Sequence, residues 1–74
     1  MSRLPQVSGR DVVKVLQKIG YEQDRIRGSH IVMRQIQSPH NRITVPDHKP
    51  VAKGTLRSII RQAGLNVEEF ISLL

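Results

Sequence analysis

The sequence predicts an α+β fold in which helices cover one face of a three-stranded antiparallel sheet. Three observations support this prediction: a helical apolar stripe near the N-terminus, a central stretch rich in β-branched residues, and two further helical stripes near the C-terminus. The 74 residues contain no internal repeat, low-complexity tract or linker. We therefore expect one domain over residues 1–74, with an αβββα core, a short extra C-terminal helix, and one sheet face left to solvent or a ligand.

The first helix is predicted over residues 9–19. Ser8 followed by Asp11 resembles a capping box, and apolar residues then recur at helical spacing until a glycine ends the run. Those apolar residues are Val12, Val13, Leu16 and Ile19. Residues 21–27 follow as a weakly patterned first strand, which Gly28 interrupts.

Two further strands are predicted over residues 30–36 and 42–45, joined by a turn at residues 37–41. In the second of these strands, Ile43 and Val45 are the residues that must point into the core. Because side chains alternate between the two faces of a strand, the pairing of the hairpin decides which residues of the first strand join them.

A five-residue turn places Gln35 opposite Ile43 and Met33 opposite Val45. Ile31 and Met33 then belong to the core. A slip of one residue would reverse this assignment. The residues predicted to face away from the core are His30, Val32 and Arg34.

Two helices are predicted after the loop at residues 46–52. Gly64 ends the first helix in a left-handed C-cap, and Asn66 with Glu69 three residues later resembles a second capping box. The apolar stripes of the two helices are Leu56, Ile59, Ile60 and Ala63, and then Val67, Phe70, Ile71 and Leu74.

The net charge of +6 is concentrated in the central part of the chain. Between residues 25 and 61, Asp47 is the single acid among eight basic residues. These are Arg25, Arg27, Arg34, Arg42, Lys49, Lys53, Arg57 and Arg61. Such a concentration predicts a polyanionic partner, with nucleic acid as the first candidate. The alternative is a solvated surface on which the basic residues only maintain solubility.

Composition excludes several classes of function. The absence of cysteine excludes disulfides, thiolate zinc sites and cysteine nucleophiles. Six scattered acids and three histidines form no recognisable ligand set, so we expect no metal ion and no cofactor. No apolar run approaches the ~20 residues that span a bilayer, and residues 1–5 lack the hydrophobic region of a signal peptide. We therefore expect a cytoplasmic protein that does not engage a membrane.

An ordered set of motifs runs through nearly the whole chain. The motifs are Leu4-Pro5, Ser8-Gly9-Arg10, Gly20-Tyr21, residues 25–30 ending in Gly28-Ser29-His30, Ile43-Thr44-Val45-Pro46, Lys53-Gly54-Thr55-Leu56-Arg57 and Gln62-Ala63-Gly64-Leu65. In this order they resemble the HicA toxins. The resemblance implies a double-stranded-RNA-binding-like fold, metal-independent cleavage of mRNA, neutralisation by a HicB-like antitoxin, and a catalytic role for His30.

RNA cleavage is chemistry that a domain of this size can perform. RNA carries its own nucleophile, the 2′-hydroxyl, so the protein needs a base, an acid and positive charge near the phosphorane. Histidine suits the base because its ordinary pKa is about 6.5. His30 is the candidate base, Gly28 allows a phosphate to approach closely, and Ser29 is a candidate phosphate donor. The alternative is that these three residues only reverse the chain between two strands.

Five further residues are predicted to support the reaction. Arg34, on the predicted face of His30, is a candidate phosphate clamp, and Lys53 precedes helix amides that can hold a phosphate. Arg57 and Arg61 share one helix stripe and are predicted to follow the RNA backbone. His48 is a candidate second proton carrier.

Two binding functions compete with the enzyme. A non-catalytic RNA-binding module would use the same basic surface and is the main alternative. A helix-turn-helix DNA-binding protein is the other, with a recognition helix that begins Asn66-Val67-Glu68-Glu69. We reject this second alternative because the two glutamates would face phosphates unfavourably.

Overall fold

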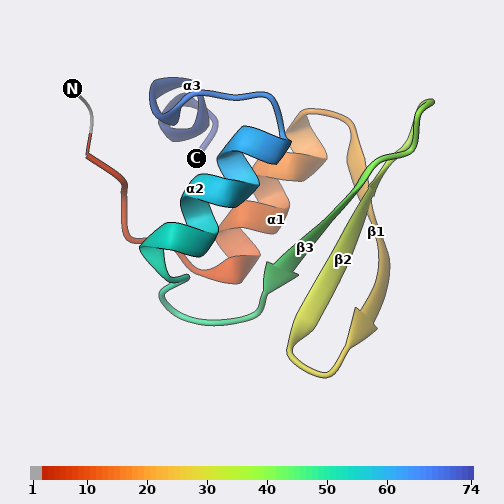
Figure 1. Cartoon of the computed structure of the whole chain (residues 1–74), viewed down its shortest axis with the longest axis horizontal. Helices are drawn as coiled ribbons and strands as arrows, with labels where there is room; N and C mark the ends of the chain where they lie inside the picture. The colour runs from red at the N-terminus through yellow and green to blue at the C-terminus, as the bar shows by residue number, and fades with distance from the viewer. Residues whose placement is uncertain (1–2) are drawn as a thin grey trace.

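The computed structural model describes residues 3–74, and its helices and strands follow the predicted order. They are α1 (Gly9–Lys18), β1 (Tyr21–Arg27), β2 (His30–Gln35), β3 (Arg42–Pro46), α2 (Lys53–Gln62) and α3 (Val67–Ser72). The strands form one antiparallel sheet in the order β1-β2-β3, and α1 and α2 lie beside it (Figure 1). The predicted α+β fold is confirmed.

Residues 1 and 2 lie outside the described residues. Two predictions fall partly on them: the single domain over residues 1–74, and the lack of a signal-peptide hydrophobic region in residues 1–5. Within residues 3–74, no helix is both long and apolar enough to cross a membrane.

The core fills the space between the sheet and the helices. Its fully buried side chains include Val12, Val15 and Leu16 of α1, Ile31 and Met33 of β2, Ile43 and Val45 of β3, Leu56 and Ile59 of α2, and Phe70 of α3. Tyr21 is also buried, and this burial raises the pKa of its phenol. The two aromatic residues of the chain, Tyr21 and Phe70, therefore both belong to the core.

The pairing of β2 with β3 differs from the prediction by two residues. Met33 lies opposite Ile43 and Ile31 lies opposite Val45, whereas the prediction placed Gln35 and Met33 at those positions. Because the offset is an even number, the same side chains still point toward the helices. The predicted faces are thus confirmed although the predicted partners are wrong.

The connection between β2 and β3 is longer than predicted because Ile36 leaves the β2–β3 ladder. The Ile36 N–H donates to the Gly20 carbonyl oxygen at 2.9 Å. The connection is closed instead by Gln35, whose N–H donates to the Asn41 carbonyl and whose side-chain oxygen accepts the Asn41 N–H, both at 2.9 Å. His40, with φ of 59°, places Nδ1 3.1 Å from the Gln35 carbonyl oxygen.

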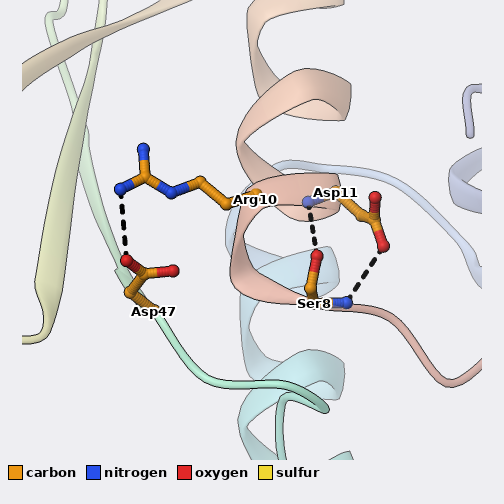
Figure 2. Close-up of polar contacts among 4 residues, drawn as sticks. All are labelled: Ser8, Arg10, Asp11 and Asp47. Atoms are coloured by element: carbon orange, nitrogen blue, oxygen red, sulfur yellow. Dashed lines mark hydrogen bonds and ion pairs between the residues drawn. The ribbon is translucent and has the colours of Figure 1, made fainter.

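Capping boxes start α1 and α3, as predicted. In α1 the Ser8 hydroxyl accepts the Asp11 N–H at 3.1 Å, and the Asp11 carboxylate accepts the Ser8 N–H at 3.0 Å (Figure 2). Asn66 and Glu69 form the same pair of bonds in α3. Gly64, just after α2, has the predicted positive φ, 74°.

The start of α1 is fastened to the segment that follows β3. The Gly9 N–H donates to the His48 carbonyl oxygen at 2.9 Å, and the Arg10 guanidinium pairs with Asp47 at 3.1 Å (Figure 2). A Cβ on Gly9 would overlap the Pro46 carbonyl oxygen. The absence of a side chain at Gly9 therefore lets this segment lie against α1.

We predict that Gly9→Ala destabilises the fold by about 1–3 kcal/mol, because the added methyl group forces two backbone segments apart. The matched control is Gly54→Ala in α2, where a Cβ meets nothing within 4 Å. This control should raise stability by up to about 1 kcal/mol because alanine favours helix. Urea unfolding of both variants measures the difference, and equal stabilities would contradict the close approach at Gly9.

The Asp11 capping box predicts a loss of stability in acid. The Ser8 backbone N–H, and then the Ser8 hydroxyl, hold the pKa of Asp11 below its ordinary value of 3.8. A carboxyl group with a lowered pKa stabilises the fold above its unfolded-state pKa, and this contribution disappears as the pH falls through the folded-state value. Asp11→Asn should therefore reduce the urea midpoint near neutral pH and flatten its decline below pH ~4.

Glu68→Gln, which removes an exposed acid outside the α1 capping box, is the matched control for that experiment. It should keep the acid decline of the unmodified protein. A decline that is the same in all three proteins would show that Asp11 does not contribute to it.

Candidate active site

A two-residue turn places His30 at the start of β2. Gly28 has φ of 59° and Ser29 has no positive φ, a pattern that suits glycine at the first position of a tight hairpin turn. Arg27 and His30 are the residues paired across this turn. The Ser29 carbonyl accepts the Asp47 N–H at 2.6 Å, so the turn is also held to the segment after β3.

The sheet face opposite the helices, which we call the outer face, carries three rows of cross-strand neighbours. The rows are Arg27-His30-Pro46, Arg25-Val32-Thr44 and Glu22-Arg34-Arg42. Residues paired across strands share a face. Arginines of all three strands therefore surround the exposed His30 and the valine beside it.

One residue of β1, Asp24, has no partner in this ladder. Gln23 lies opposite Met33 and Arg25 lies opposite Val32, so Asp24 forms a β-bulge between them. The Asp24 carboxylate pairs with the Arg42 guanidinium at 3.1 Å.

Two open hollows meet at His30. The first, about 450 Å³, lies on the outer face and is lined by Arg25, Arg27, His30, Val32, Arg42 and Thr44. The second, about 400 Å³, lies between β3 and the start of α2 and is lined by His30, Thr44, Pro46, His48, Ala52 and Thr55. The structure thus places His30 between an arginine-lined hollow and a hollow that contains a second histidine.

The start of α2 at the second hollow has no side-chain cap. Ala52 occupies the N-cap position and makes no side-chain hydrogen bond, and the first turn contains no acid. First-turn N–H groups have no partner within a helix and favour negative charge. Lys53, the first residue of α2, adds a positive charge at this end.

A larger cavity, about 620 Å³, lies elsewhere, between α1 and the C-terminal residues. Its lining includes Val15, Lys14, Lys18, Leu73 and Leu74 but not His30. Within residues 3–74, no group of three or more histidine, aspartate or glutamate side chains gathers in a way that could hold a metal ion.

Residues 9–65 match the family described as the HicA toxin of bacterial toxin-antitoxin systems. The match covers more than three quarters of the chain. The chain belongs to the HicA toxin family. A comparison with curated proteins found no match. HicA toxins are generally ribonucleases, and membership of a toxin-antitoxin family implies an antitoxin partner.

In this HicA toxin, the predicted site residues occupy different parts of the surface. His30 and His48 line the same hollow. Gly28 and Ser29 form the turn before His30. Arg34 lies on the outer face four residues along β2 from His30 and lines neither hollow, and its Nε is buried without a hydrogen-bond partner in residues 3–74.

The three predicted RNA-binding residues of α2 line neither of the two hollows: Lys53, Arg57 and Arg61. Thr55 lines the second hollow, and Arg57 and Arg61 lie about 200° and 240° around the helix from it, at 100° per residue. They therefore face a different side of α2.

The arginines that line the first hollow were assigned to no site by sequence reasoning. Arg25, Arg27 and Arg42 belong to the basic central stretch, but the polar pattern of residues 21–27 gave no indication of which face each occupies. Nothing in the sequence around Thr44 or Thr55 indicates that either threonine lines a site. The resemblance to HicA toxins identified His30 as a candidate, but only the fold shows which residues surround His30.

Proposed function

We propose that this HicA toxin is a metal-independent endoribonuclease that cleaves mRNA, with His30 as the base. The observation that carries the proposal is the position of His30, exposed between a hollow lined by three arginines and a hollow that contains His48. We also propose that residues 1–74 form one HicA-like domain, because one apolar core extends from Val7 to Phe70.

The proposed reaction uses the 2′-hydroxyl of the RNA as nucleophile. His30 accepts the 2′-hydroxyl proton while the 2′-oxygen attacks the adjacent phosphorus, and the bond from phosphorus to the 5′-oxygen breaks. A proton from His48 neutralises the departing 5′-oxygen. The products are a 2′,3′-cyclic phosphate and a 5′-hydroxyl end.

Cationic and hydrogen-bonding groups around His30 support the phosphorane. Arg34 is proposed as the phosphate clamp on the outer face, and the uncapped start of α2 with Lys53 provides N–H groups and positive charge beside the second hollow. At the turn, Gly28 has open space where a Cβ would be, and the Ser29 hydroxyl is a candidate donor. Arg57 and Arg61 are proposed to contact the RNA backbone beyond the reacting nucleotides.

We predict that the purified protein cleaves RNA but not DNA of the same sequence, because DNA lacks the 2′-hydroxyl. The products should carry 2′,3′-cyclic phosphate or 3′-phosphate ends, and EDTA should not reduce the rate. His30→Ala should reduce the rate by about 100-fold to 10,000-fold while the protein stays folded. Gel analysis of labelled RNA, with enzymatic identification of the product ends, measures these effects.

The matched control is His40→Ala, which removes the histidine of the β2–β3 connection, outside both hollows. It should retain the rate of the unmodified protein. A His30→Ala variant that cleaves RNA normally would show that the site is elsewhere. Products with 3′-hydroxyl ends, or a requirement for magnesium, would contradict the mechanism, and RNA binding without cleavage would favour the non-catalytic alternative.

We propose that the HicB-like antitoxin inhibits the toxin by covering the outer face around His30. The basic outer face favours a partner that presents acidic or polar groups. The acidic first turn of α3, with Glu68 and Glu69, would lie outside this contact.

The antitoxin proposal predicts competition between antitoxin and RNA. An RNA with a 2′-deoxy substitution at the cleavage site should lose its binding to the toxin as antitoxin is added, which fluorescence anisotropy measures. The antitoxin should also bind more weakly to the His30→Ala and Arg34→Ala variants, whose altered residues lie on the outer face. A stable ternary complex, with neither affinity reduced, would show that inhibition does not work by covering the site.

A further inference from the structure

We infer that the bulge at Asp24 makes β1 a phosphate-binding strand, on which Arg25 and Arg27 hold the RNA backbone beside His30. The inference rests on the proposed ribonuclease function and adds to it the path of the substrate. It assigns the first hollow to backbone phosphates of the RNA, with the strand passing over His30 toward the start of α2.

The bulge determines the face that both arginines occupy. From the pair Gln23–Met33, a regular ladder would continue with Arg25 opposite Ile31 and would turn Arg25 and Arg27 toward the helices. The extra residue, Asp24, shifts the alternation by one. Arg25 consequently lies opposite Val32, and Arg27 lies opposite His30. Bulges that redirect side chains in this way are common next to active sites.

Core packing does not account for the bulge. The shift directs Ile26 to the same face as the fully buried Ile31, yet the Ile26 side chain stays 49% exposed. Figure 1 shows the reason, since the β1–β2 turn projects beyond the helices. The bulge thus leaves about half of Ile26 exposed, whereas it places both arginines fully on the outer face.

Arg25 and Arg27 are free to bind an anion. In residues 3–74 the ion pairs are Arg10–Asp47 and Arg42–Asp24, so neither Arg25 nor Arg27 is paired with an acid. Both line the first hollow. Of the three arginines there, Arg42 alone is already neutralised by a carboxylate.

The spacing of the two arginines suits an extended nucleic-acid strand. Two residues apart on one face of a strand, they are separated by about 7 Å along β1. This distance is comparable to the separation of consecutive phosphates in an extended single strand. Arg27 is the member of the pair directly opposite His30, so its phosphate is next to the reacting one.

The test measures RNA affinity in the His30→Ala background, so that cleavage does not interfere and the result does not depend on catalysis. Log affinity for a single-stranded RNA is plotted against log salt concentration. Arg25→Gln with Arg27→Gln should lower the slope by about 0.7 for each lost phosphate contact, about 1.4 in total. The matched control, Arg3→Gln with Lys14→Gln, removes the same charge away from the sheet and should keep the slope.

Two variants of Asp24 test the role of the bulge. Deletion of Asp24 should lower the slope as the double arginine variant does, because the arginines turn to the opposite face. Asp24→Asn keeps the extra residue and frees Arg42, so it should bind RNA more tightly. Circular dichroism checks folding, and if the deletion variant does not fold, the double arginine variant decides.

An unchanged slope in the double arginine variant would overturn the inference, even if the toxin cleaves RNA as proposed. Normal RNA binding by this variant, with loss of antitoxin binding instead, would assign the arginines to the protein partner and would also overturn it. A folded deletion variant that binds RNA normally would show that the bulge does not place the arginines. Failure of the cleavage assay alone would contradict the proposed function and leave the binding result standing.

Discussion

A chain of 74 residues can cover one face of its sheet but not both. The helices α1 and α2 pack on the face that carries Ile31, Met33, Ile43 and Val45, and these side chains become fully or almost fully buried. The outer face is left uncovered, and polar side chains predominate on it. The same limit on size that makes the core small also makes a whole sheet face accessible to a large, flexible substrate, for which a deep cleft is not needed.

Most of the fold could be predicted because helix periodicity, caps and the apolar hairpin all indicated the same architecture. The pairing of β2 and β3 could not, because polar residues close the connection: Gln35 bonds to Asn41, and the apolar pattern does not indicate that closure. The bulge was equally hidden. Six of the seven residues of β1 are exposed, so no alternation existed from which a shift at Asp24 could be detected.

The candidate site could be predicted where a local motif determines it and not where it depends on packing. Gly28-Ser29-His30 is a tight turn whose geometry follows from its own residues. The proximity of His48 to His30 depends on a contact distant in sequence, the close approach of the Gly9 backbone to the segment after β3. The four-residue spacing of Arg57 and Arg61 indicates that they are neighbours on α2, but it does not indicate which side of the molecule they face.

The position of β1 at the edge of the sheet has a consequence for self-association. An edge strand presents unpaired N–H and C=O groups that can template pairing with another molecule, and a long flat edge promotes aggregation. Charged side chains along β1 and the irregularity at Asp24 both oppose such pairing. The charges that suit β1 for the proposed contact with RNA also make it a poor partner for a second copy of itself, so the same residues would serve both substrate binding and resistance to self-association.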